Sequence, residues 1–155
     1  MSADKIDIKR VTAEETVPLR HSVLWPDHPV SHVLLPEDAS GLHYGAFLPG
    51  SPVAVAVISV FIDPLPAAPA NASSQSQHAA RFRKFACALE HQGKGVGTRL
   101  LTHVFEVAAS ELGCGVVWCD ARTSAAGWYE RRGMRRFGEV FFKGDIEYTR
   151  MMRTL

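Results

Sequence analysis

Three glycines within five residues mark the part of this chain best suited to hold a large ligand. Gly93, Gly95 and Gly97 lack Cβ atoms, so the backbone between them can turn sharply and approach a bulky group. Apolar residues then recur every three or four positions, which predicts an amphipathic helix to about Leu112 with Gly113 as its stop. The first turn of such a helix has unpaired N–H groups at the positive end of its dipole. The turn and the helix together predict an anion site, most naturally for a phosphate.

Spacing excludes two other glycine-rich motifs. A P-loop needs Ser or Thr directly after its lysine to hold Mg²⁺, whereas Lys94 is followed by Gly95. A dinucleotide fingerprint needs Gly-x-Gly-x-x-Gly early in a βαβ unit, with an acidic residue about 20 positions on. Here the turn reads Gly-x-Gly-x-Gly and lies past the middle of the chain. A tight turn that binds no ligand is the remaining alternative.

A second motif further along the chain makes the first one specific. Residues 92–97 (Gln-Gly-Lys-Gly-Val-Gly) resemble the Gln/Arg-x-x-Gly-x-Gly/Ala signature of the GNAT superfamily of acyl-CoA N-acyltransferases. Residues 125–134 (Ala-Ala-Gly-Trp-Tyr-Glu-Arg-Arg-Gly-Met) resemble the family's Ala-x-x-Phe-Tyr-x-x-x-Gly-Phe segment. The two matches have the separation expected in the family, and the resemblance spans nearly the whole chain.

The resemblance implies that acetyl-CoA is the cofactor and that the glycine turn holds its pyrophosphate. In the family, strands four and five splay apart at a bulge, and the pantetheine arm enters the opening as though it were another strand. The main chain of Cys87 and Leu89 should therefore bond the pantetheine amides, because a splayed strand offers unpaired groups. The residues expected at the pyrophosphate, chiefly through backbone groups, are Gln92, Gly93, Gly95, Gly97 and Thr98.

Three further positions belong to the expected cofactor site. Lys94 is either a direct phosphate contact or a solvated side chain close to it. Ala125 opens the second motif. Arg122 stands where the family often has Asn, so its side chain is expected either to reach a CoA phosphate or to pair with Asp120.

Tyr129 and Glu90 are the candidate catalytic residues. Tyr129 matches the tyrosine that in many family members protonates the departing CoA thiolate, a task that suits a neutral phenol. Its alternative role is packing, because a Trp-Tyr pair on a helix is common in protein cores. The attacking amine must also lose a proton, and Glu90 is the carboxylate nearest to the end of strand four; its alternative is a solvated loop residue.

Other reactive side chains have simpler interpretations. His43 and Tyr44 on the second strand are candidates for the acceptor cleft, although a lone strand histidine is more often structural. Cys87 lies near the expected acyl site, but direct transfer in this family needs no acyl-cysteine, and a buried cysteine usually acts as a small hydrophobe. The proline- and histidine-rich segment 26–36 is placed, by the resemblance, in the region that often covers the acceptor.

The elements that must position these residues follow the order β-α-α-β-β-β-α-β-α-β-β, which is the GNAT topology. Thr12 with Glu15 forms a capping box, and a strand–helix–strand unit around the glycine turn should place strands four and five parallel and adjacent. The fold class is therefore α/β (α+β), a mixed six- to seven-stranded sheet with strands four and five splayed, flanked by about four helices. The expected strands cover 6–11, 42–48, 53–62, 81–90, 115–119, 137–142 and 146–152; the expected helices cover 12–18, 19–25, 96–112 and 124–132.

Length and composition predict a single soluble domain. The 155 residues suit one ordinary core, so residues 1–155 form one N-acetyltransferase domain with a flexible Pro/Ala/Ser/Gln-rich loop at about 64–80. A net charge of +1 gives no general attraction for nucleic acid or anionic membrane. The three cysteines show no paired spacing, so neither a disulfide framework nor a metal site is predicted. A charged N-terminus and the lack of a long apolar run predict a cytoplasmic protein.

These observations predict an acyl-CoA-dependent N-acyltransferase that moves acetyl from acetyl-CoA to a primary amine by direct attack. A non-catalytic module that binds or senses acyl-CoA is the alternative. The acceptor is a small-molecule or peptide amine whose identity the sequence leaves open. Because family members often dimerise through their terminal strands, a homodimer is also left open.

Overall fold

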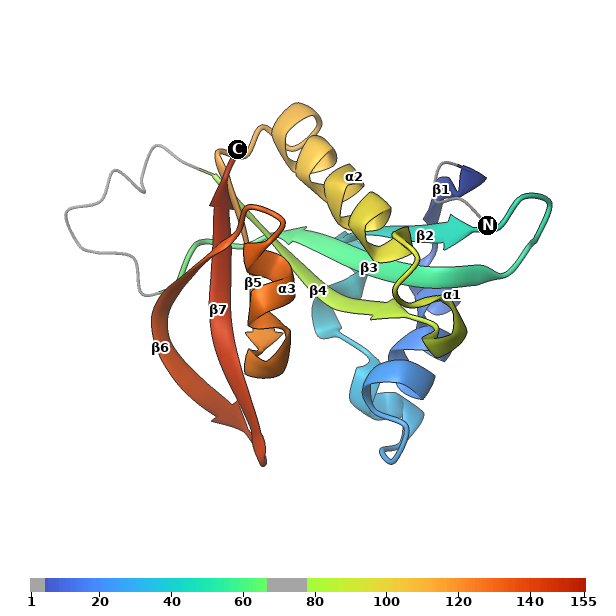
Figure 1. The fold of residues 1–155 in the computed structure, drawn as a ribbon, viewed down its shortest axis with the longest axis horizontal. Coiled ribbons are helices and arrows are strands. Elements are labelled where there is room, and N and C mark those ends of the chain that lie inside the picture. Colours follow the sequence, from blue (N-terminus) through green and yellow to red (C-terminus); the bar gives the residue numbers. More distant parts are fainter. Residues whose placement is uncertain (1–4, 67–77) are drawn as a thin grey trace. The chain divides into compact units, whose positions relative to one another are not determined.

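The computed structural model of the chain describes residues 5–66 and 78–155, and seven strands in these residues form one sheet (Figure 1). Hydrogen bonding orders them β1-β2-β3-β4-β5-β7-β6, and β4 and β5 are parallel neighbours, as predicted. The expected loop at 64–80 lies largely outside the described residues, except that strand β4 already begins at Ala79. The strands are β1 (Asp7–Val11), β2 (Leu42–Phe47), β3 (Ala54–Ile62), β4 (Ala79–Cys87), β5 (Val116–Arg122), β6 (Arg135–Lys143) and β7 (Ile146–Thr154).

Three α-helices lie in the described part of the chain, so the expectation of about four was wrong. They are α1 (Ala13–Leu19), α2 (Val96–Ser110) and α3 (Ala126–Glu130). Thr12 and Glu15 form the predicted capping box of α1, but Pro18 has no N–H for the helical ladder and the next turn widens into a π-helix at Arg20–Leu24. Three more prolines by residue 36 leave only 3₁₀ turns at Val30–Val33 and Pro36–Ser40. None of the described helices is long and apolar enough to cross a bilayer.

The described residues divide into two compact units, each of which is described by itself. Unit 1 comprises Met1–Phe61 and Phe82–Val104, and unit 2 comprises Ile62–Arg81 and Phe105–Leu155. The organisation of residues 1–155 as one domain stays a prediction.

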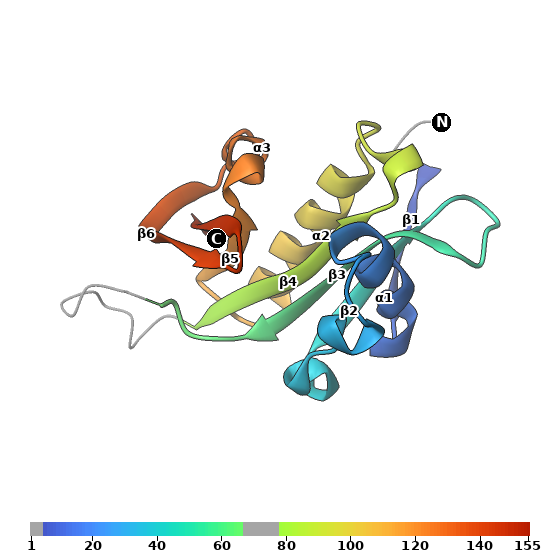
Figure 2. The ribbon, with the colours of Figure 1, turned by 90° about the horizontal axis from the view of Figure 1, so that it is seen from below.

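In unit 1, two neighbouring residues of β2 show which elements cover the two faces of the sheet. His43 and Tyr44 point to opposite sides, as successive strand residues must. The Tyr44 ring meets His103 of α2 edge-on, with centroids 4.7 Å apart. The His43 imidazole instead forms hydrogen bonds with the Ser59 hydroxyl and with the Asp38 carbonyl. Asp38 lies in the 3₁₀ turn Pro36–Ser40, between α1 and β2. The helix α2 therefore covers one face of β2, and the segment after α1 covers the other (Figure 2).

The apolar face of α2 forms as predicted. Its buried residues recur at three- and four-residue intervals, and Gly113, with φ +64°, takes the left-handed conformation that ends a helical segment. The helix stops at Ser110, slightly before the expected boundary. The buried residues of this face are Val96, Leu100, Leu101, Val104, Val107 and Ala108.

A left-handed residue lies in the middle of β4. Lys84 has φ +54°, and it is the one non-glycine residue with positive φ in the described ranges. The rings of Phe82 and Phe85 are in edge contact at 6.2 Å, although residues three apart in a regular strand face opposite ways. Lys84 therefore interrupts the regular geometry of the strand, which is the kind of local irregularity that a bulge introduces.

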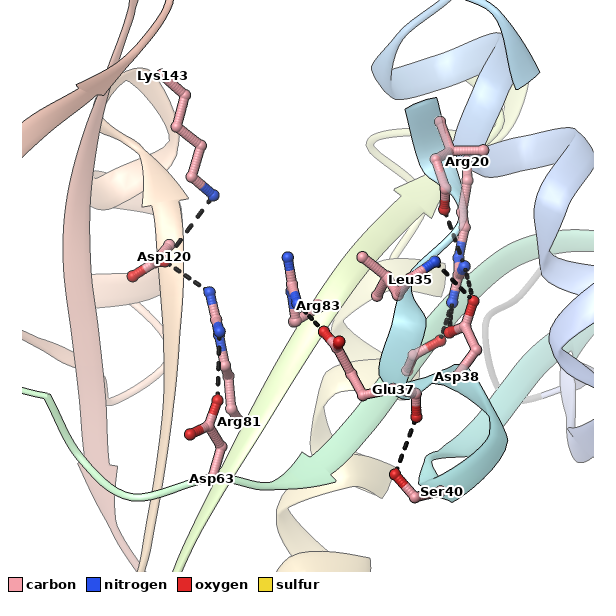
Figure 3. Close-up of polar contacts among 12 residues, drawn as sticks. Arg20, Leu35, Glu37, Asp38, Ser40, Asp63, Arg81, Arg83, Asp120 and Lys143 are labelled. Carbon is pink, nitrogen blue, oxygen red and sulfur yellow. Dashed lines mark hydrogen bonds and ion pairs between the residues drawn. The ribbon is translucent and has the colours of Figure 1, made fainter. Parts of the chain in front are cut away.

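In unit 2, Trp118 of β5 pairs with the parallel strand β4 on one side and with the antiparallel strand β7 on the other. The parallel register joins Ala79–Arg81 of β4 to Val116–Trp118 of β5, and β5 also pairs with β7. The Trp118 indole N–H donates to the Asp63 carbonyl at 2.9 Å, and Arg81 lies over the Trp118 ring at 4.7 Å. Arg81 also pairs with the carboxylates of Asp63 and Asp120 (Figure 3). These contacts fix the start of β4 against β5.

The guanidinium of Arg20 is completely buried in unit 1, and its ligands come from three separate segments (Figure 3). One nitrogen donates to the Val33 carbonyl at 3.0 Å and to Asp38 Oδ2 at 2.9 Å. The other donates to Asp38 Oδ1 at 2.9 Å and to Ser59 Oγ of β3 at 2.8 Å. Since Ser59 also bonds His43, the π-helix, two 3₁₀ turns and two strands share one polar network. His43 is therefore a structural residue.

The carboxylate of Asp38 balances this buried charge. Burial alone would raise the pKa of Asp38, but the hydrogen bonds from Arg20 and from the Leu35 N–H, with the charges of Arg20 and His43, outweigh burial and lower it. A carboxyl group with a depressed folded-state pKa stabilises the fold fully above its unfolded pKa of about 4. That stabilisation is lost as the pH falls through the lower, folded-state pKa.

Replacing Asp38 by Asn should lower the free energy of unfolding by about 3 kcal/mol at pH 7, because the Arg20 charge would stay buried without its counter-ion. The difference from the wild type should shrink below about pH 4, where the Asp38 carboxyl of the unfolded wild-type chain begins to protonate. Urea unfolding at pH 7 and pH 3 measures both effects. The exposed Asp7→Asn variant is the control and should change stability by less than about 0.5 kcal/mol. Equal stability of Asp38→Asn and wild type at pH 7 would contradict this role.

Candidate active site

The glycine turn between β4 and α2 has the geometry of an anion site. Gly93 and Gly95 have φ of +76° and +84°, a conformation that L side chains rarely adopt, so both positions require glycine or a close substitute. Gly97 is the second residue of α2. Its missing Cβ leaves the helix backbone open to a ligand and is not needed for the turn. A Cβ built on Gly93 would meet no atom within 4 Å, so space is open above the turn. These features fit a diphosphate held by backbone N–H groups at a helix start.

The side chain of Gln92 fastens the turn to the end of β4. Its amide nitrogen donates to the Cys87 carbonyl at 2.9 Å. The next residue, Ala88, donates its N–H to the Val55 carbonyl of β3 at 2.8 Å. The role predicted for Gln92 at the pyrophosphate stays a prediction, and in this structure its side chain fixes the strand end from which the turn departs. Lys94 is exposed beside the turn.

The short 3₁₀ turn Leu89–His91 places an apolar and an acidic side chain at the end of β4. Leu89 is 75% exposed, so its backbone and side chain are accessible to a ligand at the end of β4. Glu90 is also exposed, and together with burial its negative charge raises the pKa of the half-buried Cys87 thiol. Cys87 is therefore held as a neutral thiol, which agrees with a non-nucleophilic role.

Tyr129 lies in unit 2 and is the fourth of the five residues of α3. Its side chain is only 9% exposed, and its ring meets the Trp128 ring edge-on at 5.1 Å. Burial, and secondarily the neighbouring Cys119, raises the pKa of the Tyr129 phenol well above its ordinary value of about 10. The hydroxyl is therefore a neutral proton donor at every physiological pH. Burial also supports the packing role, so the catalytic assignment stays a prediction.

Arg122 and Ala125 lie before α3 in unit 2. Arg122 ends β5, and Ala125 closes the 3₁₀ turn Thr123–Ala125 that leads into the helix. The carboxylate of Asp120 contacts Arg81 at 2.7 Å and Lys143 at 3.9 Å (Figure 3), and it also contacts Arg150 at 3.3 Å. Asp120 thus has three basic partners besides any pairing with Arg122, and both readings of Arg122 stay open.

The structure brings the predicted residues together in two groups. Unit 1 holds the end of β4 and the glycine turn, which contain Cys87, Leu89, Glu90, Gln92, Gly93, Lys94, Gly95, Gly97 and Thr98. Unit 2 holds Arg122, Ala125 and Tyr129. Unit 2 also has a cavity of about 410 Å³ lined by Arg132, Arg135 and Arg153, and it contains none of the predicted residues.

Residue-by-residue reading of the sequence missed two basic side chains. Arg20 looked like an ordinary helix residue, and nothing in its neighbours signals that it is fully buried. Lys84 looked like an ordinary strand residue, yet its left-handed backbone and its ammonium group 5.9 Å from the Trp25 ring set it apart. The signal that could have exposed Lys84 is the irregular alternation of β4, where Arg83, Lys84 and Phe85 are all partly exposed in succession.

The strand order, the parallel β4–β5 pair and the glycine turn at the start of α2 define an acyl-CoA N-acyltransferase fold. The family model for the acetyltransferase (GNAT) family matches residues 9–134, and this chain belongs to that family. It is an N-acetyltransferase of the GNAT type, a family that uses acetyl-CoA or CoA and acts on small-molecule or peptide amines.

Individual relatives agree with this assignment. The chain is 29% identical, over 138 residues, to the "Uncharacterized N-acetyltransferase YitI" of Bacillus subtilis (strain 168), covering 88% of this chain and 87% of that protein. A GNAT-family acetyltransferase from Staphylococcus aureus Mu50 has the same fold, with a TM-score of 0.69, 16% identity, and coverage of 96% of this chain and 98% of that one. A chain of the NatC complex bound to Gag peptide and CoA superposes with a TM-score of 0.71 and 14% identity, covering 97% and 99%.

Replacing Gly97 by Val should weaken CoA binding about tenfold or more, because the new side chain would project where backbone is expected to meet phosphate. Isothermal titration calorimetry with CoA measures the loss. The control is Thr102→Val, an exposed position on the same helix, which should bind CoA as the wild type does. Unchanged affinity in a folded Gly97→Val protein would remove the pyrophosphate from this turn.

Proposed function

We propose that this chain transfers acetyl from acetyl-CoA to a primary amine by direct attack. The observation that carries the proposal is the pair of left-handed glycines just before the N-terminus of α2, within the first of the two GNAT motifs. Acetyl-CoA is the donor substrate, with its pyrophosphate at the glycine turn and its pantetheine along the end of β4 at Cys87 and Leu89. The exposed Leu89 and the open space over Gly93 support this placement.

The proposed reaction needs one acid and one base. The amine nitrogen forms a bond to the thioester carbonyl carbon, the carbon–sulfur bond breaks, and the sulfur takes a proton. Tyr129 is the proposed donor of that proton, since burial keeps its phenol neutral. The amine loses one proton, either to Glu90 or through water to solvent, so that the products are an N-acetylamine and free CoA thiol.

Release of free thiol from acetyl-CoA on addition of an amine panel tests the proposed function. A thiol-reactive dye follows the reaction, and mass spectrometry identifies the acetylated amine. A protein that binds CoA by calorimetry but releases no thiol with any amine would instead be the non-catalytic acyl-CoA-binding module. Size-exclusion chromatography with light scattering would decide whether the chain forms the homodimer that the family resemblance leaves open.

Replacing Tyr129 by Phe should lower kcat about 10²-fold with little change in acetyl-CoA affinity, because only the proton-donating hydroxyl is removed. The loss should shrink with an acyl donor whose thiol is more acidic, since a better leaving group needs less protonation. Steady-state kinetics with both donors separates catalysis from packing. A packing role predicts lower stability, nearly unchanged turnover and no dependence on the leaving group.

Replacing Glu90 by Gln should lower kcat about 10²-fold if its carboxylate takes the amine proton, within the usual range for a general base. The Michaelis constant for acetyl-CoA should stay unchanged. Parallel assays of the Glu111→Gln variant, also an exposed carboxylate, control for loss of surface charge. Wild-type turnover in Glu90→Gln would assign proton removal to solvent and leave Glu90 as a solvated loop residue.

A further inference from the structure

Unit 1 contains a group of basic and aromatic side chains that the proposed reaction does not use. Trp25 meets His28 and His32 edge-on, with centroids 4.9 and 4.7 Å away. The two imidazoles stack on each other at 4.3 Å, and the Lys84 ammonium lies 5.9 Å from the Trp25 ring centre. These four residues are called the Trp25 cluster below.

The Trp25 cluster concentrates groups that carry or accept positive charge. The pKa of His32 is lowered by loss of hydration and by the positive charges of His28 and Lys84, so these groups act on one another at close range. Two acidic residues lie in the segment 25–37: Asp27 is exposed next to His28, and Glu37 is paired with Arg83 (Figure 3). A carboxylate beside the Lys84 ammonium would meet a positive charge, and the neighbouring imidazoles could each donate a ring N–H to it.

The backbone beneath the Trp25 cluster is held by the Arg20 network. Arg20 donates to the carbonyl of Val33, the residue directly after His32, and Asp38 accepts the N–H of Leu35 at 3.1 Å. A segment with little regular structure is thereby fixed on both sides of Leu34. A ligand would therefore meet a surface that is already ordered, which lowers the entropic cost of binding.

Apolar side chains border the same surface. Val30 and Leu34, two residues before and two residues after His32, are 47% and 51% exposed, which leaves apolar area next to the basic groups. A ligand that suits both features carries an anionic group together with an apolar body.

One member of the Trp25 cluster, Lys84, lies on β4, the strand that leads to the proposed donor site. Lys84 precedes Cys87 by three residues, which is about 10 Å along an extended strand. Its left-handed backbone breaks the alternation of β4 at this point, and its side chain extends to Trp25. A small amine near the end of β4 would bring any anionic group it carries within reach of Lys84.

We propose that the Trp25 cluster binds the carboxylate of the acceptor, so that the amines acetylated by this chain are small molecules that also carry a carboxylate. Amino acids with apolar side chains satisfy both the basic groups and the exposed Val30 and Leu34. This inference rests on the proposed acetyl transfer and names the substrate class for it.

Leucine and leucinamide test the inference, because leucinamide lacks the negative charge of the carboxylate. Each variant is compared with the wild type on the same substrate, so that the different amine pKa values of the two substrates cancel. In the Lys84→Asn variant, kcat/KM for leucine should fall at least tenfold, whereas kcat/KM for leucinamide should change less than twofold. Asn suits the position because it adopts the left-handed backbone more readily than most residues. Lys84→Arg, which keeps the charge, should retain most of the activity with leucine.

The matched control is Lys9→Gln. Lys9 lies over the Phe47 ring at 5.2 Å in the same unit, so this variant also removes a lysine from an aromatic face, but outside the Trp25 cluster. It should leave both substrates unaffected. Equal losses for leucine and leucinamide in Lys84→Asn would overturn the proposal, as would acetylation of spermidine or O-phosphoethanolamine in preference to leucine.

A binding measurement separates this inference from the proposed function. N-acetylleucine added to the wild-type protein should shift the imidazole NMR signals of His28 and His32, and the Lys84→Asn variant should lose those shifts. Shifts without any thiol release would refute the proposed function and leave a carboxylate site standing. Absence of shifts in wild type would overturn the carboxylate site, whether or not some amine is acetylated.

Discussion

The buried guanidinium of Arg20 is the constraint on which the irregular half of unit 1 depends. A fully buried charge is costly unless it is paired and hydrogen-bonded, and Asp38, Ser59 and the Val33 carbonyl supply those partners from separate segments. The segment between α1 and β2 contains three prolines and no long helix, so apolar packing alone would position it poorly. Removing one partner would cost more than one bond, because the charge would remain buried.

Burial sets the protonation state of two reactive side chains among the predicted site residues. Burial keeps the Tyr129 phenol neutral, and burial with the charge of Glu90 keeps the Cys87 thiol neutral. A neutral phenol can give a proton to a leaving thiolate, whereas a neutral thiol is a poor nucleophile. These protonation states are compatible with the proposed proton donation by Tyr129 and with direct attack by the amine, without an acyl-cysteine.

Local sequence signals predicted the parts of the fold that short-range chemistry determines. The capping box at Thr12, the apolar face of α2 and the parallel β4–β5 pair all follow from periodicity, capping and chain handedness. The prediction of a second α-helix after β1 was wrong. Pro18 interrupts the helical hydrogen bonds, and the residues that follow it are held by the network around Arg20. The Trp25 cluster could not be predicted from the sequence either, because it brings together residues nearly sixty positions apart through a left-handed Lys84.

The left-handed Lys84 has a consequence for comparing this chain with its relatives. Phe82 before it and Ala86 after it are both buried, yet the Phe85 ring also contacts the Phe82 ring. The side chains around Lys84 therefore do not follow the strict alternation of a regular strand. Inward-facing and outward-facing positions in this part of β4 cannot be assigned from odd and even residue numbers alone when the chain is aligned with another.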